Sequence, residues 1–284
     1  MKKILVTGCY GFLAGHLIQV LKEKKYEVVG LARHIPHNHV PYPDYVYLGD
    51  MRDKELVEKA VSSSDGVIHI AGILGTQETV NNPYPSVEVN VMGALNVLEA
   101  CRIWKIPVVQ IAVGNHWEQN SYSITKTCAE RFAIMYAREH GVRVNIVRAL
   151  NAYGERQKAK PVRKIIASFI TRALNNEPIQ IYGDGEQLMD MVHVRDVASV
   201  LLKVLENETT YGNVYEAGTG TALTVNEIAQ TIINACGSTS ALEHLPMRPG
   251  ESVHAVVKAE NPYPHNYIPF KEGIQKTIRW YEKA

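Results

Sequence analysis

The first 150 residues alternate short apolar runs with longer segments of helical periodicity, and this alternation restricts the possible folds. Each apolar run is continuous, which predicts strands that are buried on both faces. Strands of this kind, separated by helices, form a parallel sheet covered by helices on both sides. The expected strands lie at 4–6, 28–31, 46–48, 66–70, 107–113 and 142–147, and the expected helices at 15–25, 53–62, 87–104 and 122–140.

After about residue 150 the alternation loosens, which indicates a smaller lobe at the carboxyl ends of the strands. The sequence therefore predicts an α/β fold: a Rossmann-like, doubly wound parallel sheet with a smaller α+β substrate-binding lobe. We place the first domain at 1–152 and the lobe mainly at 153–284, with some of its segments returning to the sheet. Helices are expected there at 163–174, 196–205, 225–235 and 271–281, with a turn at 183–185 and a loop at 261–270.

Composition excludes several classes of protein. The net charge is +1, which predicts neither nucleic-acid binding nor attachment to a membrane surface. No apolar run approaches the ~18 residues that a membrane span requires. The four cysteines are far apart and form no CxxC pair, so we expect no metal site and a reduced, cytoplasmic protein. They are Cys9, Cys101, Cys128 and Cys236.

Glycines follow the first strand and precede the first helix. Gly8, Gly11 and Ala14 have the spacing Gly-x-x-Gly-x-x-Ala, in which small residues allow a tight turn against phosphate oxygens. Glycines alone also serve as structural punctuation, but their place between a strand and a helix favours dinucleotide binding. At the end of the second strand, Arg33 stands where an acidic residue would bind a ribose 2′-hydroxyl. Arg33 favours NADP over NAD as cofactor, unless it is only a solvated loop charge.

Tyr122 and Lys126 are four residues apart at the start of a predicted helix and therefore share one face. An ammonium group beside a phenol, together with an oxidised nicotinamide, is expected to lower the phenol pKa from its usual value near ~10. Tyr122 would then exchange a proton with a sugar hydroxyl while hydride moves from or to the same carbon. The pair is a weak signal alone, but here it follows a dinucleotide turn.

Further segments have the order and spacing of one family. They are 49–53, 69–72, 88–100, 148–154, 181–187, 192–198, 248–251 and the final helix from residue 272. With the glycine turn and the Tyr-Lys pair, they resemble the extended short-chain dehydrogenase/reductase family of NDP-sugar epimerases and dehydratases over nearly the whole chain. The resemblance implies that Gly8, Tyr10, Gly11, Phe12, Leu13, Arg33, Asp50, Met51, Ile70, Ala71, Gly72, Asn90, Tyr122 and Lys126 bind the cofactor. It implies that Thr76, Asn151, Arg163, Gln187 and Arg248 bind the nucleotide-sugar substrate.

The resemblance implies a reaction through a keto-sugar intermediate, with epimerisation as the first choice. The alternatives are an NADPH-dependent keto-sugar reductase, a dehydratase with a non-standard acid/base set, and a non-catalytic dinucleotide-binding regulator. Relatives form dimers through the helices that correspond to 87–104 and 122–140, so a homodimer built on a helix bundle is expected.

The sequence departs from the family at the end of the fifth strand. Relatives carry a Ser or Thr there that binds the reacting hydroxyl, whereas this chain has no hydroxyl residue near Val113, and the following loop is short. Asn115 and His116 are the candidate catalytic replacements, and His116 is equally well explained as a solvated loop histidine. Glu118, Thr76 and Ser123 are further candidates. The acidic residues expected of a 4,6-dehydratase are absent.

A second departure concerns the diphosphate of the substrate. Met189 stands where relatives often have an Arg, which leaves Arg248 as the main candidate for diphosphate binding. Arg156, Lys160 and Arg163 are possible substitutes.

Overall fold

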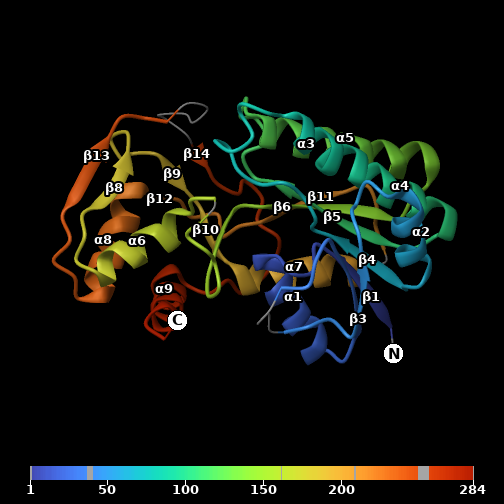
Figure 1. Ribbon diagram of the computed structural model, residues 1–284, viewed down its shortest axis with the longest axis horizontal. Helices are drawn as coiled ribbons and strands as arrows, with labels where there is room; N and C mark the ends of the chain where they lie inside the picture. The colour runs from blue at the N-terminus through green and yellow to red at the C-terminus, as the bar shows by residue number, and fades with distance from the viewer. Residues whose placement is uncertain (1, 37–40, 161, 208, 249–255, 284) are drawn as a thin grey trace.

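The computed structural model describes residues 2–283, apart from 37–40, 161, 208 and 249–255. A seven-stranded sheet forms its centre, with every neighbouring pair of strands parallel (Figure 1). This sheet, flanked by helices, confirms the predicted Rossmann-like class. Its strands, in spatial order, are β11 (Val214–Ala217), β6 (Val144–Ala149), β5 (Val108–Val113), β4 (Gly66–His69), β1 (Lys3–Thr7), β2 (Glu27–Ala32) and β3 (Tyr45–Leu48).

The chain runs outward from β1 to β3 and then returns to the other side of β1 through β4, so the strand order reverses between β1 and β4. Ligands of open α/β sheets bind at such a reversal, outside the carboxyl ends of the strands. Two buried apolar clusters, one on each face, fix the sheet between its helices. One face is covered by α1 (Phe12–Glu23) and α7 (Val194–Glu206), and the other by α2 (Lys54–Ser62), α4 (Gly93–Trp104) and α5 (Ser121–His140) (Figure 1).

The single helix expected at 87–104 consists of three pieces. They are α3 (Tyr84–Ser86), the π-helix η1 (Val87–Met92) and α4. Apolar periodicity does not distinguish a π-helical turn from an α-helical one, so no sequence signal indicated it. The π-helix carries the buried Asn90, whose side chain points to the chain that follows β4.

A smaller lobe has its own apolar core, separate from the two clusters on the sheet (Figure 1). Its strands have only two to four residues, too short for a periodic signal, and the sequence did not predict them. α7 and β11 come from the same half of the chain but pack on, or join, the central sheet. The remaining elements are β7 (Asn151–Tyr153), α6 (Ile165–Leu174), β8 (Ile179–Tyr182), β9 (Leu188–Met189), β10 (Met191–His193), β12 (Leu223–Thr224), α8 (Val225–Cys236), β13 (Leu242–Leu245), β14 (Val256–Val257) and α9 (Phe270–Tyr281).

No helix within the described ranges combines the length and the apolar character needed to cross a membrane.

Candidate active site

The glycine turn lies at the reversal of strand order. Gly8 has a φ of +66°, and a Cβ on it would approach the Cα of Ala71 to 3.0 Å, so a side chain is excluded both by conformation and by space. Its N–H donates to the carbonyl of Leu31 at 2.8 Å, and the N–H of Gly11 donates to the carbonyl of Gly8 at 2.8 Å. The turn is therefore held against the ends of β1, β2 and β4.

The first helix begins directly after this turn, at Phe12, three residues earlier than expected. Gly11 is its N-cap, and no side chain among the described residues accepts a hydrogen bond from the N-terminal N–H groups. Its first turn also contains no acidic residue. A helix N-terminus of this kind attracts an anion through its N–H groups and its dipole. The residues present thus fit a dinucleotide diphosphate.

The chain after β4 is held by a buried hydroxyl. Thr7 Oγ1 accepts from the N–H groups of Ile70 and Ala71 at 3.0 and 3.1 Å, and it lies 2.8 Å from Nδ1 of His69. Two accepted bonds use both lone pairs of the oxygen, so the hydroxyl donates its proton to His69. The imidazole is therefore neutral, and burial lowers its pKa to about 3. Ile70, Ala71 and Gly72 lie beside the glycine turn as a result.

Asn90 connects this segment to α5. Its Oδ1 accepts from the N–H of Ile73 at 2.7 Å, while its Nδ2 donates to the carbonyl of Ile73 and to Thr125 Oγ1, both at 3.1 Å. Gly72 is required nearby, because a Cβ there would lie 2.9 Å from Asn90 Oδ1. In this structure Asn90 holds the wall of the proposed cofactor site together.

The residues predicted to surround the adenosine half of the dinucleotide cofactor follow β2 and β3 in the chain. Asp50 accepts two side-chain hydrogen bonds from Arg52, at 2.9 and 3.1 Å, which lowers the pKa of its carboxyl. Met51 is buried beside Gly93. Arg33 is exposed just after β2 and close enough to Asp50 to contribute to that lowering.

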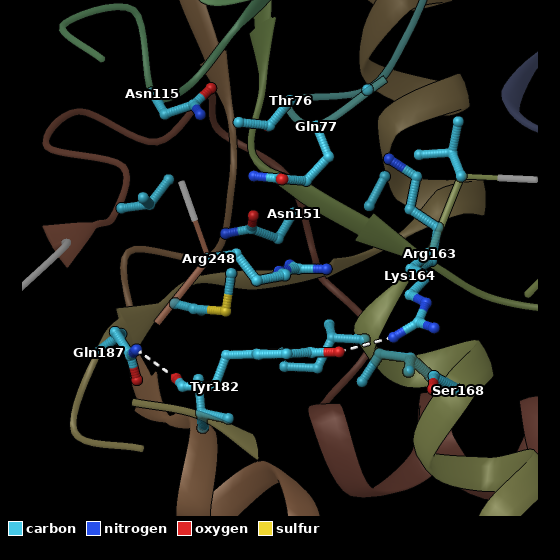
Figure 2. Close-up of a pocket in the computed structure, with 18 of the residues that line it drawn as sticks. Thr76, Gln77, Asn115, Asn151, Arg163, Lys164, Ser168, Tyr182, Gln187 and Arg248 are labelled. Atoms are coloured by element: carbon cyan, nitrogen blue, oxygen red, sulfur yellow. Dashed lines mark hydrogen bonds between the residues drawn. The ribbon is translucent and has the colours of Figure 1, made fainter. Parts of the chain in front are cut away.

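A cavity of about 370 Å³ opens at the carboxyl ends of β5 and β6, between the sheet and the smaller lobe. Volumes of ~300–1,000 Å³ are usual for small-molecule sites. Segments far apart in the sequence meet there, as Figure 2 shows for Thr76, Asn115, Asn151 and Arg248. The predicted residues that line the cavity are Thr76, Asn115, Glu118, Tyr122, Asn151, Arg163, Gln187 and Arg248.

Tyr122 and Lys126 share one face of α5, as expected from their spacing. Tyr122 lines the cavity, and Lys126 lies behind it with only 4% of its surface exposed. Burial raises the pKa of Tyr122 to about 12 and lowers that of Lys126 to about 8. Desolvation thus raises the phenol pKa in the chain alone, and the expected lowering, which includes the charge of an oxidised nicotinamide, stays a prediction.

The short segment after β5 brings a carboxylate to the cavity. Glu118 Oε2 accepts from Asn115 Nδ2 and from Asn120 Nδ2, each at 2.8 Å, and both Glu118 and Asn115 line the cavity. Asn120 also caps α5, since its Oδ1 accepts from the N–H of Ser123 at 2.9 Å. This network fixes the first turn of the helix that carries Tyr122.

His116 is not brought to the cavity. Its Nδ1 lies 3.2 Å from the carbonyl of Gly114, to which it donates, and the ring stays beside its own loop. The geometry agrees with the interpretation of a loop histidine rather than a catalytic one. Ser123 is buried in α5 and does not line the cavity either.

Cationic groups gather at the lobe side of the cavity. Arg163 Nη1 donates to the hydroxyl of Tyr182 at 2.6 Å, and the guanidinium of Arg248 lies 4.4 Å from the centre of the same ring (Figure 2). Lys164 lines the cavity as well, and burial lowers its pKa. Residues 249–251 of the predicted Arg248 segment lie outside the described residues.

The other proposed substitutes for the missing arginine lie elsewhere. Met189 lines the cavity where relatives often have that arginine, whereas Lys160 does not reach it. Arg156 is also absent from the lining, and its Nη2 lies 3.4 Å from His16 Nδ1 on α1. Of the substitutes considered, the structure therefore places only Arg163 at the cavity.

Gln187 is 8% exposed and lines the cavity close to Tyr182. Its Nε2 donates to the carbonyl of Tyr182 at 2.9 Å (Figure 2). Its buried Oε1 has no hydrogen-bond partner within the described part of the chain. A buried acceptor of this kind is suited to an N–H donor of a ligand.

Sequence reasoning missed Lys164 and Tyr182. Lys164 is adjacent to Arg163 just before α6, but a lysine before a helix is too common to be a signal. Tyr182 lies in a segment that the resemblance identified, yet nothing in the sequence indicates that two arginines converge on its ring.

An uncapped helix N-terminus at the glycine turn, together with a phenol and an amine beside a polar cavity, defines the class of a dinucleotide-dependent enzyme with a small-molecule substrate. The family model named "NAD dependent epimerase/dehydratase family" matches residues 4–218. The chain is 32% identical to a putative UDP-glucose 4-epimerase of Methanocaldococcus jannaschii, over 98% of this chain and 97% of that protein. This protein belongs to the NAD-dependent epimerase/dehydratase family.

Two further similarities describe the range of that family. A dTDP-glucose 4,6-dehydratase of Streptomyces antibioticus is 26% identical over 98% of this chain and 92% of its own. The crystal structure of the Thermus thermophilus UDP-glucose 4-epimerase in complex with NAD superposes with a TM-score of 0.87 and 26% identity, covering 99% of both chains.

Proposed function

We propose that this protein modifies a nucleotide-linked sugar through a keto-sugar intermediate, most directly by epimerisation, with UDP-sugars as the first substrates to test. The observation that carries the proposal is the meeting of Tyr122 with Arg163, Lys164 and Arg248 in one cavity, at the same edge of the sheet as the dinucleotide turn. The relatives support a UDP-sugar, because UDP-glucose 4-epimerases are among the similar proteins at both sequence and structure level.

At the sugar end, Tyr122 takes the proton of the hydroxyl that is oxidised and later returns it. Asn115 replaces the missing Ser or Thr: its Nδ2 carries two N–H groups, of which one donates to Glu118, so the other can donate to the oxygen of the reacting hydroxyl. When bound, oxidised nicotinamide accepts the hydride and adds a positive charge near the phenol. That charge favours the phenolate, which burial alone disfavours.

At the nucleotide end, three cations suit a diphosphate: Arg163, Lys164 and Arg248. Guanidinium groups bind phosphate oxygens in pairs, which compensates for Met189 in place of an arginine. Deeper in the lobe, the buried Oε1 of Gln187 is an acceptor for a base N–H. Uracil and thymine both present such a donor.

The test is incubation of the purified protein with UDP-, dTDP-, GDP- and CDP-sugars without added cofactor, followed by NMR of the sugar ring. We expect conversion of a UDP-sugar to its C4 epimer without net consumption of cofactor. Stoichiometric consumption of added NADPH would instead indicate the reductase. Absence of turnover, with biological activity retained by Tyr122→Phe, would indicate the non-catalytic regulator.

The Glu118 carboxylate favours a second candidate, sugar dehydration. Elimination of water from a 4-keto sugar requires a base for the proton beside the carbonyl and an acid for the leaving hydroxyl. An epimerase that only transfers hydride needs neither. If the reaction is dehydration, Glu118→Gln will abolish formation of the 6-deoxy product. If it is epimerisation, the same variant will retain most of its turnover.

The cofactor preference for NADP over NAD remains a proposal that rests on Arg33 alone. The Thermus thermophilus UDP-glucose 4-epimerase does not support this preference, since its crystal structure contains NAD. Arg33 is exposed just after β2, where a 2′-phosphate would be bound. Competition binding decides the matter: a preference for NADP⁺ that Arg33→Ala removes would support the proposal, and tighter binding of NAD⁺ to the wild type would contradict it.

We further propose a homodimer through the bundle formed by η1, α4 and α5. These elements expose large apolar side chains, namely Val87, Met92, Ile103 and Ile124. Exposed apolar side chains grouped on neighbouring helices are typical of protein interfaces. Light scattering of the purified chain should give twice the mass of the 31.7 kDa protomer. A monomer at micromolar concentration would contradict the proposal.

A further inference from the structure

A third charged residue follows the catalytic pair along α5. Tyr122, Lys126 and Glu130 are spaced by four residues, so they lie one above another on the face that packs on the sheet. Glu130 is 2% exposed and Lys126 is 4% exposed. A buried carboxylate and a buried ammonium one helical turn apart influence each other strongly, because little water screens them.

Arg148, near the end of β6, holds this carboxylate. Its Nε donates to Glu130 Oε2 at 2.9 Å and its Nη2 donates to Glu130 Oε1 at 2.6 Å, while 20% of the arginine side chain is exposed. The bidentate geometry fixes both carboxylate oxygens. Glu130 therefore cannot turn towards Lys126, and its negative charge acts on the ammonium from a fixed position.

The elements packed against this part of α5 bring few other titratable groups. On β4, His69 is kept neutral by Thr7. β5 contains no titratable residue. η1 contacts α5 through the uncharged Asn90, and α3 contributes the exposed Tyr84. α4 contacts α5 nearer its C-terminus, where Glu99 accepts a hydrogen bond from the hydroxyl of Tyr136. Glu130 is thus the carboxylate that opposes the desolvation of Lys126, whose pKa it raises.

We propose that Glu130, held by Arg148, is a positioning residue that keeps the ammonium charge on the buried Lys126 beside Tyr122. Without Glu130 the amine loses its proton more readily, and the phenol loses the cation that favours its ionised form. Without Arg148 no positive charge offsets that of the Glu130 carboxylate, so Lys126 keeps its proton to a higher pH. The two halves of one ion pair therefore have opposite effects on the same proton.

This inference rests on the proposed role of Tyr122 and Lys126, but its first test does not require turnover. The full-length protein is labelled with ¹⁵N-lysine, and the Nζ signal of Lys126, identified by its loss in Lys126→Met, is titrated by NMR. The wild-type midpoint is expected at about pH 8. We expect Glu130→Gln to lower it by about one pH unit and Arg148→Met to raise it by a similar amount.

A purely structural role predicts a different result, because either substitution breaks the same ion pair. Shifts in the same direction, or no shift in either variant, would overturn the proposal. Glu130→Asp should restore most of the wild-type midpoint. Glu99→Gln is the matched control, since Glu99 also forms a bidentate pair, with Arg102 on α4, and should leave the midpoint unchanged.

If Arg148→Met does not fold, the double variant Glu130→Gln/Arg148→Met removes both charges of the Glu130–Arg148 pair, so neither is left buried without the other. Its midpoint should lie above that of Glu130→Gln, and an equal or lower midpoint would contradict the proposal. With an active substrate, the pH at which turnover rises should move up in Glu130→Gln and down in Arg148→Met. Shifted NMR midpoints without any turnover would support the inference and refute the proposed function, so the two fail separately.

Discussion

At the scale of single residues, the most unusual feature is a lysine kept almost fully out of water. Burial lowers the pKa of Lys126 from its usual 10.5 to about 8, so folding disfavours its charged form. Between about pH 8 and 10.5 the unfolded chain holds a proton that the native chain has released. Stability attributable to this residue therefore rises with pH across that window and is lowest below it.

Replacement of this lysine by an apolar residue should make that cost visible. We expect Lys126→Met to be more stable than the wild type by up to about 3 kcal/mol at about pH 7, with the difference shrinking towards about pH 10. Urea unfolding at both pH values measures it. A variant that is equally stabilised at the two pH values would show that the lysine proton is not the cause.

Gly8 in the cofactor turn can be compared with Gly141, the C-cap of α5, because both have the same backbone conformation. Gly8 and Gly141 have φ values of +66° and +64°, but only Gly8 has close neighbours, whereas a Cβ on Gly141 would meet nothing within 4 Å. We expect Gly8→Ala to weaken dinucleotide binding by about tenfold or more, or ~1.4 kcal/mol. Gly141→Ala should retain wild-type affinity despite its strained backbone. Titration calorimetry with NAD⁺ measures both, and equal affinities would contradict the assigned turn.

Residues with a local pattern could be predicted from the sequence. Gly8, Tyr122 and Lys126 have fixed spacing within one turn or one helix, and the structure places them where that spacing predicts. The places of Lys164 and Tyr182 at the cavity depend instead on how separate segments converge, which no local pattern encodes. The same limit applies to the raised pKa of Tyr122 in the chain alone, since the degree of burial of a helix start is a property of the tertiary structure.

At the scale of elements, the start of α5 connects stability to chemistry. Asn120 caps the helix and also donates to Glu118, two residues before Tyr122. Thr224 caps α8 in the smaller lobe through a capping box with Glu227, and it does not line the cavity. The two caps thus lie in different surroundings, one beside the cavity and one away from it.

Removal of either cap should cost about 1 kcal/mol of unfolding free energy. We expect Asn120→Ala also to lower kcat, because the first turn that carries Tyr122 loses its anchor, while Thr224→Ala keeps the wild-type kcat. Chemical denaturation and initial rates on both variants make the comparison. A parallel loss of kcat in both would mean that global stability, rather than the position of Tyr122, limits turnover.

Long elements were predictable because their apolar periodicity extends over several turns or a whole strand. Two-residue strands such as β9 and β12 exist only through pairing with distant segments, so no pattern indicated them. The π-helix around Asn90 is a further case: its apolar spacing resembles that of an α-helix, and its geometry becomes evident only with the contact to Ile73.

At the scale of the whole molecule, the two halves of the chain contribute to one site. The sheet half supplies the glycine turn and Tyr122, and the later half supplies Arg163, Gln187 and Arg248. The boundary predicted near residue 152 stays a prediction, as does the cytoplasmic location. α7 and β11 show why sequence order alone divides the chain imperfectly, since both come after that boundary and pack with the sheet.

The central claim is that Tyr122 passes a proton while hydride moves between a sugar and a nicotinamide held at the glycine turn. Stopped-flow absorbance of the reduced nicotinamide tests it on the protein loaded with oxidised cofactor and mixed with a UDP-sugar. The account predicts a transient rise and decay in the wild type, and a rise slowed by about 100-fold or more in Tyr122→Phe. Equal transients in both proteins would contradict it.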